Sequence, residues 1–228
     1  MDTQDYRIVN VGVDLERDFP VDTISVRIDL RGTHDTREEC TNEYNRLLEE
    51  VLDALAGIGI PKNEVKNGSF NISAHTEALY AKDEGGNYYY ATNRLTGYDY
   101  YAKMSLTRPF TDSEDAKAIW IALAGCSDTV HFSISFCLAD MEEAKSSLLA
   151  EAVAEGRRRA DILAGAAGAH VTGIHTISYE YASGYQMDNM VAPAGFALRK
   201  SYETAPDFNP ADERITCAVQ MQWRMELG

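Results

Sequence analysis

Two stretches of the chain alternate strictly between apolar and polar residues, and this alternation constrains the fold more than any other feature. In residues 23–31 one face carries Ile24, Val26, Ile28 and Leu30. In residues 130–138 one face carries Val130, Phe132, Ile134, Phe136 and Leu138. A period of two residues with one polar face is typical of a strand in an antiparallel sheet whose other face packs on a core. The sequence therefore predicts at least two such strands.

Helix signals follow each of these strands. Thr36-Arg37-Glu38-Glu39 is a capping-box pattern, and apolar residues recur behind it at helical spacing until Gly57 and Gly59. Asp140-Met141-Glu142-Glu143 starts a second, alanine-rich helix that is expected to run to about Ala167. A shorter helix with apolar residues at helical spacing is expected within residues 111–124.

Further strands complete two similar runs. They are expected around residues 7–13, 68–76, 77–107 (entered through a Gly-rich turn at 83–87), 170–181 and 215–225. The order strand, helix, strand, strand then occurs twice, which indicates an internal repeat. The predicted fold class is α+β: a two-layer sandwich of long antiparallel or mixed strands with helices on one side. Residues 1–110, with an extra N-terminal strand, would form the first β-α-β-β unit, and residues 126–228 the second, joined by a helix at 111–125 into one compact body.

Residues 182–211 fit neither unit, because they contain several glycines and prolines and show no period. A loop of this length without secondary structure is uncommon and is often functional. We expect its apolar residues to contact another subunit or a protein partner; they are Met187, Met190, Val191, Phe196 and Leu198. The alternative is that the segment folds back on its own sheet, partly as a β-hairpin.

No pattern in the chain indicates reaction chemistry. The sequence has no phosphate-binding loop and no nucleophile elbow, and its cysteines and histidines lack the spacing of a metal site. His170 and His175 are five residues apart on a strand and therefore point to opposite faces. We accordingly expect no catalytic, cofactor-binding or metal-binding residues and no cofactor.

Charge and hydropathy limit the classes of partner that the chain is expected to bind. The net charge of −15, from 36 acidic against 21 basic residues, opposes binding to nucleic acid. The one basic run, Arg157-Arg158-Arg159, is expected to lie on a solvated helix surface. No apolar run approaches about 20 residues, so no membrane span is expected. Since residues 1–5 do not resemble a signal peptide, the expected location is cytoplasmic, or periplasmic if a leader has been removed.

The order of several short motifs resembles the SIMPL-domain (DUF541) family, which includes bacterial periplasmic immunogens of the 26–28 kDa outer-membrane-protein type. The motifs are Val9-Asn10-Val11-Gly12 before Pro20-Val21-Asp22, Ala56-Gly57-Ile58-Gly59-Ile60, Leu95-Thr96-Gly97-Tyr98, and Glu142-Glu143-Ala144 leading to Gly168. Gly156 departs from the alanine usual in the family and is expected to weaken the helix centre by about 1 kcal/mol. The resemblance implies a shared fold, no assigned catalytic residues, and envelope-associated proteins for which ring-like or channel-like self-assembly has been proposed.

Together these observations favour a non-catalytic, self-assembling structural or interaction protein that forms a homo-oligomer. The alternative is a small-molecule-binding protein or an enzyme with a pocket between the two units. Thirteen tyrosines, several of them clustered at Tyr88-Tyr89-Tyr90 and Tyr98 to Tyr101, would line such a pocket or simply pack on the sheets.

Overall fold

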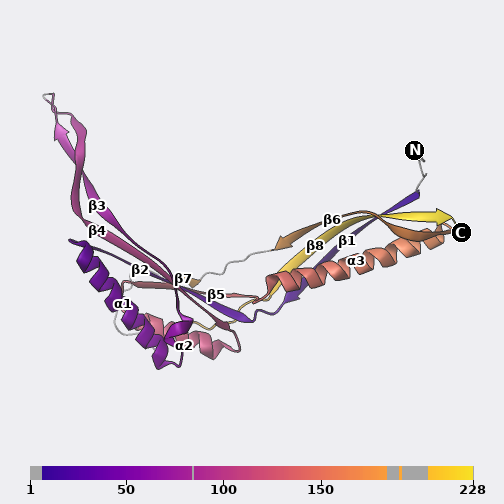
Figure 1. Ribbon diagram of the computed structural model, residues 1–228, viewed down its shortest axis with the longest axis horizontal. Coiled ribbons are helices and arrows are strands. Elements are labelled where there is room, and N and C mark those ends of the chain that lie inside the picture. The colour runs from indigo at the N-terminus through magenta and orange to yellow at the C-terminus, as the bar shows by residue number, and fades with distance from the viewer. Residues whose placement is uncertain (1–6, 84, 184–189, 192–204, 228) are drawn as a thin grey trace. The chain divides into compact units, whose positions relative to one another are not determined.

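The computed structural model describes residues 7–83, 85–183, 190–191 and 205–227, and it has the predicted α+β fold. The chain forms two compact units (Figure 1). Unit 1 comprises residues 1–21, 138–186 and 210–228, and unit 2 comprises residues 22–137 and 187–209. Each unit combines an antiparallel sheet with helical structure on one face: one long helix in unit 1 and two helices in unit 2.

Unit 2 is built on a five-stranded antiparallel sheet. Its strand order is β3-β4-β2-β5-β7, with β2 at Thr23–His34, β3 at Lys66–Lys82, β4 at Tyr88–Pro109, β5 at Val130–Cys137 and β7 at Met190–Val191. The alternation of residues 23–31 and 130–138 is realised here, because β2 pairs with β5 in register from Thr23↔Cys137 to Leu30↔Val130. The apolar sides of both strands therefore lie on the same face of the sheet.

Two helices cover that face of unit 2. They are α1 (Arg37–Gly57) and α2 (Ser113–Ala124), and a 3-10 turn, η1 (Lys62–Glu64), follows α1. The predicted capping box is present, since Thr36 Oγ1 accepts from the Glu39 amide and Glu39 accepts from the Thr36 amide. The core between helices and sheet includes Val26, Ile28, Leu47, Val51, Tyr100, Met104 and Leu123.

Unit 1 has a three-stranded antiparallel sheet in the order β1-β8-β6. The strands are β1 (Arg7–Phe19), β6 (Ala169–Ser183) and β8 (Glu213–Leu227), and one long helix, α3 (Met141–Ala166), lies along the sheet (Figure 1). Asp140 caps α3 by accepting from the Glu143 amide. Small residues at every fourth position of α3 face the sheet, namely Ala144, Ala152, Gly156, Ala160 and Ala164, with Leu148 among them.

Strand pairing differs from the expected division into residues 1–110 and 126–228. β1 pairs with β8 over its whole length and completes unit 1, while β5 pairs with β2 in unit 2. Alternation shows which face of a strand is buried but not which strand lies beside it. The apolar face of β5 packs with α2, as the edge contact between the Trp120 and Phe132 rings shows.

The hairpin of unit 2 also differs from expectation. Residues 77–82 belong to β3 and not to the longer strand predicted over residues 77–107, and β4 begins only at Tyr88. The ladder continues to the turn because cross-strand pairs persist, with Glu77 opposite Arg94 and Lys82 opposite Tyr88. Asp83 closes the turn, since its carboxylate accepts from the Asn87 amide at 2.8 Å.

Candidate functional site

The residues predicted to contact a partner are only partly placed. Met187, Phe196 and Leu198 lie outside the described residues. Met190 and Val191 form β7, whose backbone pairs antiparallel with Ile134 and Ser133 of β5. Farther along, Phe208 is buried in the core of unit 2 against Trp120 and Phe136. Both placements agree with the alternative that this segment folds back on its own sheet, although an isolated phenylalanine in an aperiodic stretch gives no pattern from which its burial could be predicted.

An open strand edge in unit 1 is the first feature with evident binding capacity. β6 is the end strand of its sheet, and within the described part of the chain no strand pairs with its outer side. The pairing of β6 with β8 shifts register after Val171 and after Ile174. From Thr176 to Ser183 the pairing is regular. That regular stretch presents a row of backbone N–H and C=O groups in the geometry that another strand requires.

Apolar side chains accompany this open edge. Ile174, Ile177 and Tyr179 lie on the face that α3 covers for the other strands, yet they are 41%, 43% and 54% exposed. β6 contains one acidic residue, Glu180, and no lysine or arginine. By contrast β1, the other end strand, carries five charged residues in 13. Charged side chains deter pairing between copies of an edge strand, so β6 is the less protected edge of unit 1.

The far end of the β3–β4 hairpin is the second such feature. We call residues 77–83 and 85–95 the tyrosine hairpin, because it carries Tyr80, Tyr88, Tyr89 and Tyr90. Their exposed fractions range from 54% at Tyr89 to 69% at Tyr88. The pairing of β2 with β4 ends with His34 opposite Tyr98, so the tyrosine hairpin extends beyond β2 (Figure 1).

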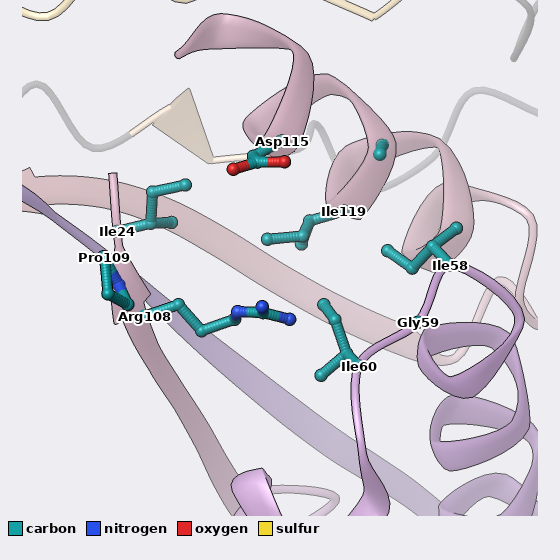
Figure 2. Close-up of a pocket in the computed structure, with 9 residues that line it drawn as sticks. Ile24, Ile58, Gly59, Ile60, Arg108, Pro109, Asp115 and Ile119 are labelled. Atoms are coloured by element: carbon teal, nitrogen blue, oxygen red, sulfur yellow. The ribbon is translucent and has the colours of Figure 1, made fainter. Parts of the chain in front are cut away.

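The best-formed pocket lies within unit 2 and is small. It has a volume of about 80 Å³ and is lined by the loop after α1, the ends of β2 and β4, and α2. Figure 2 shows four isoleucines around it, with the Arg108 side chain extending towards Ile60 and Asp115 on the opposite wall. Arg108 lies 3.5 Å from Glu64. Ligand pockets usually measure about 300–1,000 Å³, and no tyrosine lines this one.

A shallow polar depression lies on the sheet of unit 1, on the face opposite α3. Its lining includes Asn10, Thr176, Ser178, Gln220 and Gln222. The Thr176 hydroxyl donates to Gln222 Oε1 at 2.7 Å. Amides and hydroxyls supply hydrogen bonds, but these side chains do not titrate near neutral pH and cannot serve as an acid or base there.

One cluster in unit 2 superficially resembles catalytic machinery. On the polar face of the sheet, Asp99 accepts from the Thr33 hydroxyl at 2.5 Å and contacts His75 Nδ1 at 2.9 Å. The hydrogen bonds from Thr33 and then His75 lower the pKa of the Asp99 carboxyl. Because the hydroxyl is bonded to the carboxylate and not to the imidazole, the histidine has no nucleophile to activate. These groups form a cross-strand polar network.

The remaining candidates for chemistry are similarly accounted for. Burial, and then the Glu50 carboxylate, raise the pKa of the Cys126 thiol to about 11, so the reactive thiolate is scarce at neutral pH. The three arginines of the basic run pair with nearby acids on α3, as predicted for a solvated surface: Arg157 with Asp161, and Arg158 and Arg159 with Glu155. No group of three potential metal ligands occurs among the described residues.

Comparison with family models agrees with the motifs. A model described as "SIMPL: Protein of unknown function (DUF541)" matches residues 9–223. The chain belongs to the SIMPL family. A search of curated proteins finds no match. The match covers both units of this SIMPL protein, including most of β1 and most of β8. Within the described part of the SIMPL chain, no helix is long and apolar enough to cross a membrane.

Proposed function

We propose that this SIMPL protein is a non-catalytic structural protein that assembles with copies of itself. The observation that carries the proposal is the open edge of β6. It combines an unpaired, regular stretch of backbone from Thr176 to Ser183 with exposed apolar side chains and little charge.

The contact is an antiparallel pairing of β6 with β6 of a second copy about a twofold axis. Such an isologous contact uses the same surface on both molecules. It joins two three-stranded sheets into one, and the exposed Ile177 and Tyr179 of each copy come together on the face that carries α3. Backbone hydrogen bonds supply affinity, and the alternating side chains select the register.

The absence of machinery in the described residues supports a structural role. The pocket in unit 2 measures about 80 Å³ and is smaller than the usual ligand site. The depression on unit 1 is larger, at about 400 Å³, but it is open and its polar lining consists of amides and hydroxyls. The Asp99 cluster lacks an activated nucleophile. The aperiodic segment 182–211 adds inter-subunit contacts in this proposal through Met187, Met190, Val191, Phe196 and Leu198.

The test is substitution of Ile177 by lysine. A charge beside the edge disrupts strand pairing between copies, while a side chain already 43% exposed tolerates the change within about 0.5 kcal/mol of folding free energy. Light scattering and sedimentation velocity at tens of micromolar are expected to show a smaller assembly than for the wild-type chain.

The matched control is Ile162→Lys. Ile162 is 57% exposed on α3, so it receives the same new charge on an apolar position away from the β6 edge. We expect it to keep the wild-type mass. Equal masses for Ile177→Lys and the wild type would show that β6 does not make the contact.

A further inference from the structure

The tyrosine hairpin is exposed on both sides. β3 is the end strand of the sheet in unit 2. Among the described residues, the part of β4 that precedes Tyr98 pairs only with β3. Two-stranded ribbons are at best marginally stable alone in water. The structure thus presents four half-exposed tyrosines on a ribbon that would gain stability from a partner.

The composition of the tyrosine hairpin suits a protein interface. Tyrosine is enriched at interface cores because it offers a large contact area with few rotatable bonds, and Asn, Gly and Thr add adaptable hydrogen bonds. Residues 85–93 read Gly-Gly-Asn-Tyr-Tyr-Tyr-Ala-Thr-Asn. Tyr80 and Tyr90 already pack edge to face across the strands, with ring centroids 6.3 Å apart.

Charge indicates which partner fits. Residues 77–95 hold two basic residues, Lys82 and Arg94, against three acidic ones, Glu77, Asp83 and Glu84, whereas the whole chain has a net charge of −15. Arg94 pairs with Glu77, and the Lys82 ammonium lies 4.7 Å from the Tyr88 ring centroid. Two copies of so acidic a protein repel each other over most of their surfaces, so a nearly neutral aromatic surface is where they can meet.

We propose that the tyrosine hairpin binds the tyrosine hairpin of a second copy about a twofold axis. Aromatic side chains from the two ribbons pack against each other, as cross-strand aromatic pairs do within a sheet. This inference rests on the proposed self-assembly and adds a second contact to it. β6 belongs to unit 1 and the tyrosine hairpin to unit 2, so the two contacts are separate surfaces, and in this proposal each copy uses them for two different neighbours.

Two independent contacts make a specific prediction about mass. With both intact, the assembly exceeds a dimer, because each copy contacts one neighbour through β6 and another through the tyrosine hairpin. Tyr88→Ser with Tyr90→Ser disables the tyrosine hairpin and leaves a dimer joined by β6. Ile177→Lys leaves a dimer joined by the tyrosine hairpin. All three substitutions together give a monomer.

The masses of these four proteins, measured by light scattering at tens of micromolar, separate the two proposals. If the double tyrosine variant keeps the wild-type mass, or if Ile177→Lys is a monomer, the tyrosine hairpin makes no contact and the β6 proposal stands. If Ile177→Lys keeps the wild-type mass while the double tyrosine variant is smaller, the β6 contact fails. A monomeric wild type overturns both.

Two further measurements guard this interpretation. Tyr101 lies on the same strand but outside the tyrosine hairpin, and its side chain is 37% exposed. We expect the Tyr101→Ser variant to keep the wild-type mass. Amide hydrogen exchange in residues 88–95 of the Ile177→Lys dimer is expected to slow as protein concentration rises. Binding to lipid vesicles that disappears in the double tyrosine variant, without a change in mass, would assign the surface to membranes and overturn the inference.

Discussion

Ion pairs at the surface lower the pKa of several carboxyl groups. Hydrogen bonds from Arg158 and Arg159 lower the pKa of the Glu155 carboxyl to about 2. Arg214 lowers the pKa of Asp18, and Arg46 lowers that of Glu43. Because these ion pairs lie at the surface of the protein, each contributes little alone.

These lowered pKa values predict a stability loss in acid. A carboxyl whose pKa is depressed by folding stabilises the fold above its ordinary pKa and loses that contribution as pH falls through the folded value. From pH 7 towards the isoelectric point near 4.7, protonation also relieves the repulsion of a chain with a charge of −15. Thermal melting followed by circular dichroism is therefore expected to show highest stability near pH 5 and a decline from about pH 4.5 to 2.

Glu155→Gln provides the control for that prediction. It removes one carboxylate with a depressed pKa, so its melting temperature should lie below that of the wild type at pH 7 and approach it as pH falls towards 2. A difference that stays constant over this range would show that Glu155 contributes nothing through its charge.

Residue-level patterns predicted the local signals well and the isolated residues poorly. The Thr36 capping box and the Asp140 cap could be predicted from the sequence because capping requires fixed residue types at fixed spacing. The burial of Phe208 could not be predicted, because it depends on ring contacts with Trp120 and Phe136 that only the folded chain creates. Ile177 and Tyr179 show the opposite error. They alternate with polar residues, which indicates burial, yet both are half exposed.

At the level of elements, the packing of α3 on its sheet depends on Gly156. A Cβ atom added there would lie 1.9 Å from Met221 Cε and 2.8 Å from Met221 Sδ. The sequence suggested only the loss of helix propensity at this position. The structure shows that the missing side chain makes room for Met221, which is buried in the core of unit 1.

Gly156→Ala is accordingly expected to destabilise the protein. Alanine gains about 1 kcal/mol of helix propensity, but displacing a buried methionine costs typically about 1–3 kcal/mol, for a net loss of about 1 kcal/mol. Adding Met221→Leu removes the colliding Cε and should recover part of it. Chemical denaturation measures all of these free energies of unfolding.

Gly165→Ala is the matched control on the same helix. Apart from the backbone of its own helix turn and its chain neighbours, no atom lies within 4 Å of the position its Cβ would take, so alanine should stabilise the protein by up to about 1 kcal/mol. Stabilisation by both substitutions would contradict the proposed role of Gly156.

Element boundaries were predicted best where alternation was strict or where a capping residue marked the end of a helix. β5 and α3 lie within a few residues of expectation. β1 runs on to Phe19, beyond the predicted 7–13. The end of this edge strand was not predicted, because its polar side meets solvent and carries Asp14, Glu16 and Asp18. The extension of β3 through residues 77–82 was missed for a similar reason: both sides of that ribbon are exposed, so no apolar face marks it.

At the scale of the whole molecule, the chain order strand, helix, strand, strand occurs twice among the longer elements, as β2-α1-β3-β4 and β5-α3-β6-β8, with the short η1 and β7 left aside. In unit 2, β2 lies beside β4; in unit 1, the corresponding place beside β8 is taken by β1 and not by β5. The internal repeat thus remains a prediction, and the pairing could not be read from the sequence because alternation does not specify a neighbour.

Self-association is the claim on which this account rests, and the mass of the wild-type protein in solution tests it most directly. Light scattering on the eluting peak at tens of micromolar is expected to give a mass greater than that of a dimer of the 25.3 kDa chain. A mass of one chain at every concentration up to that range would contradict the account.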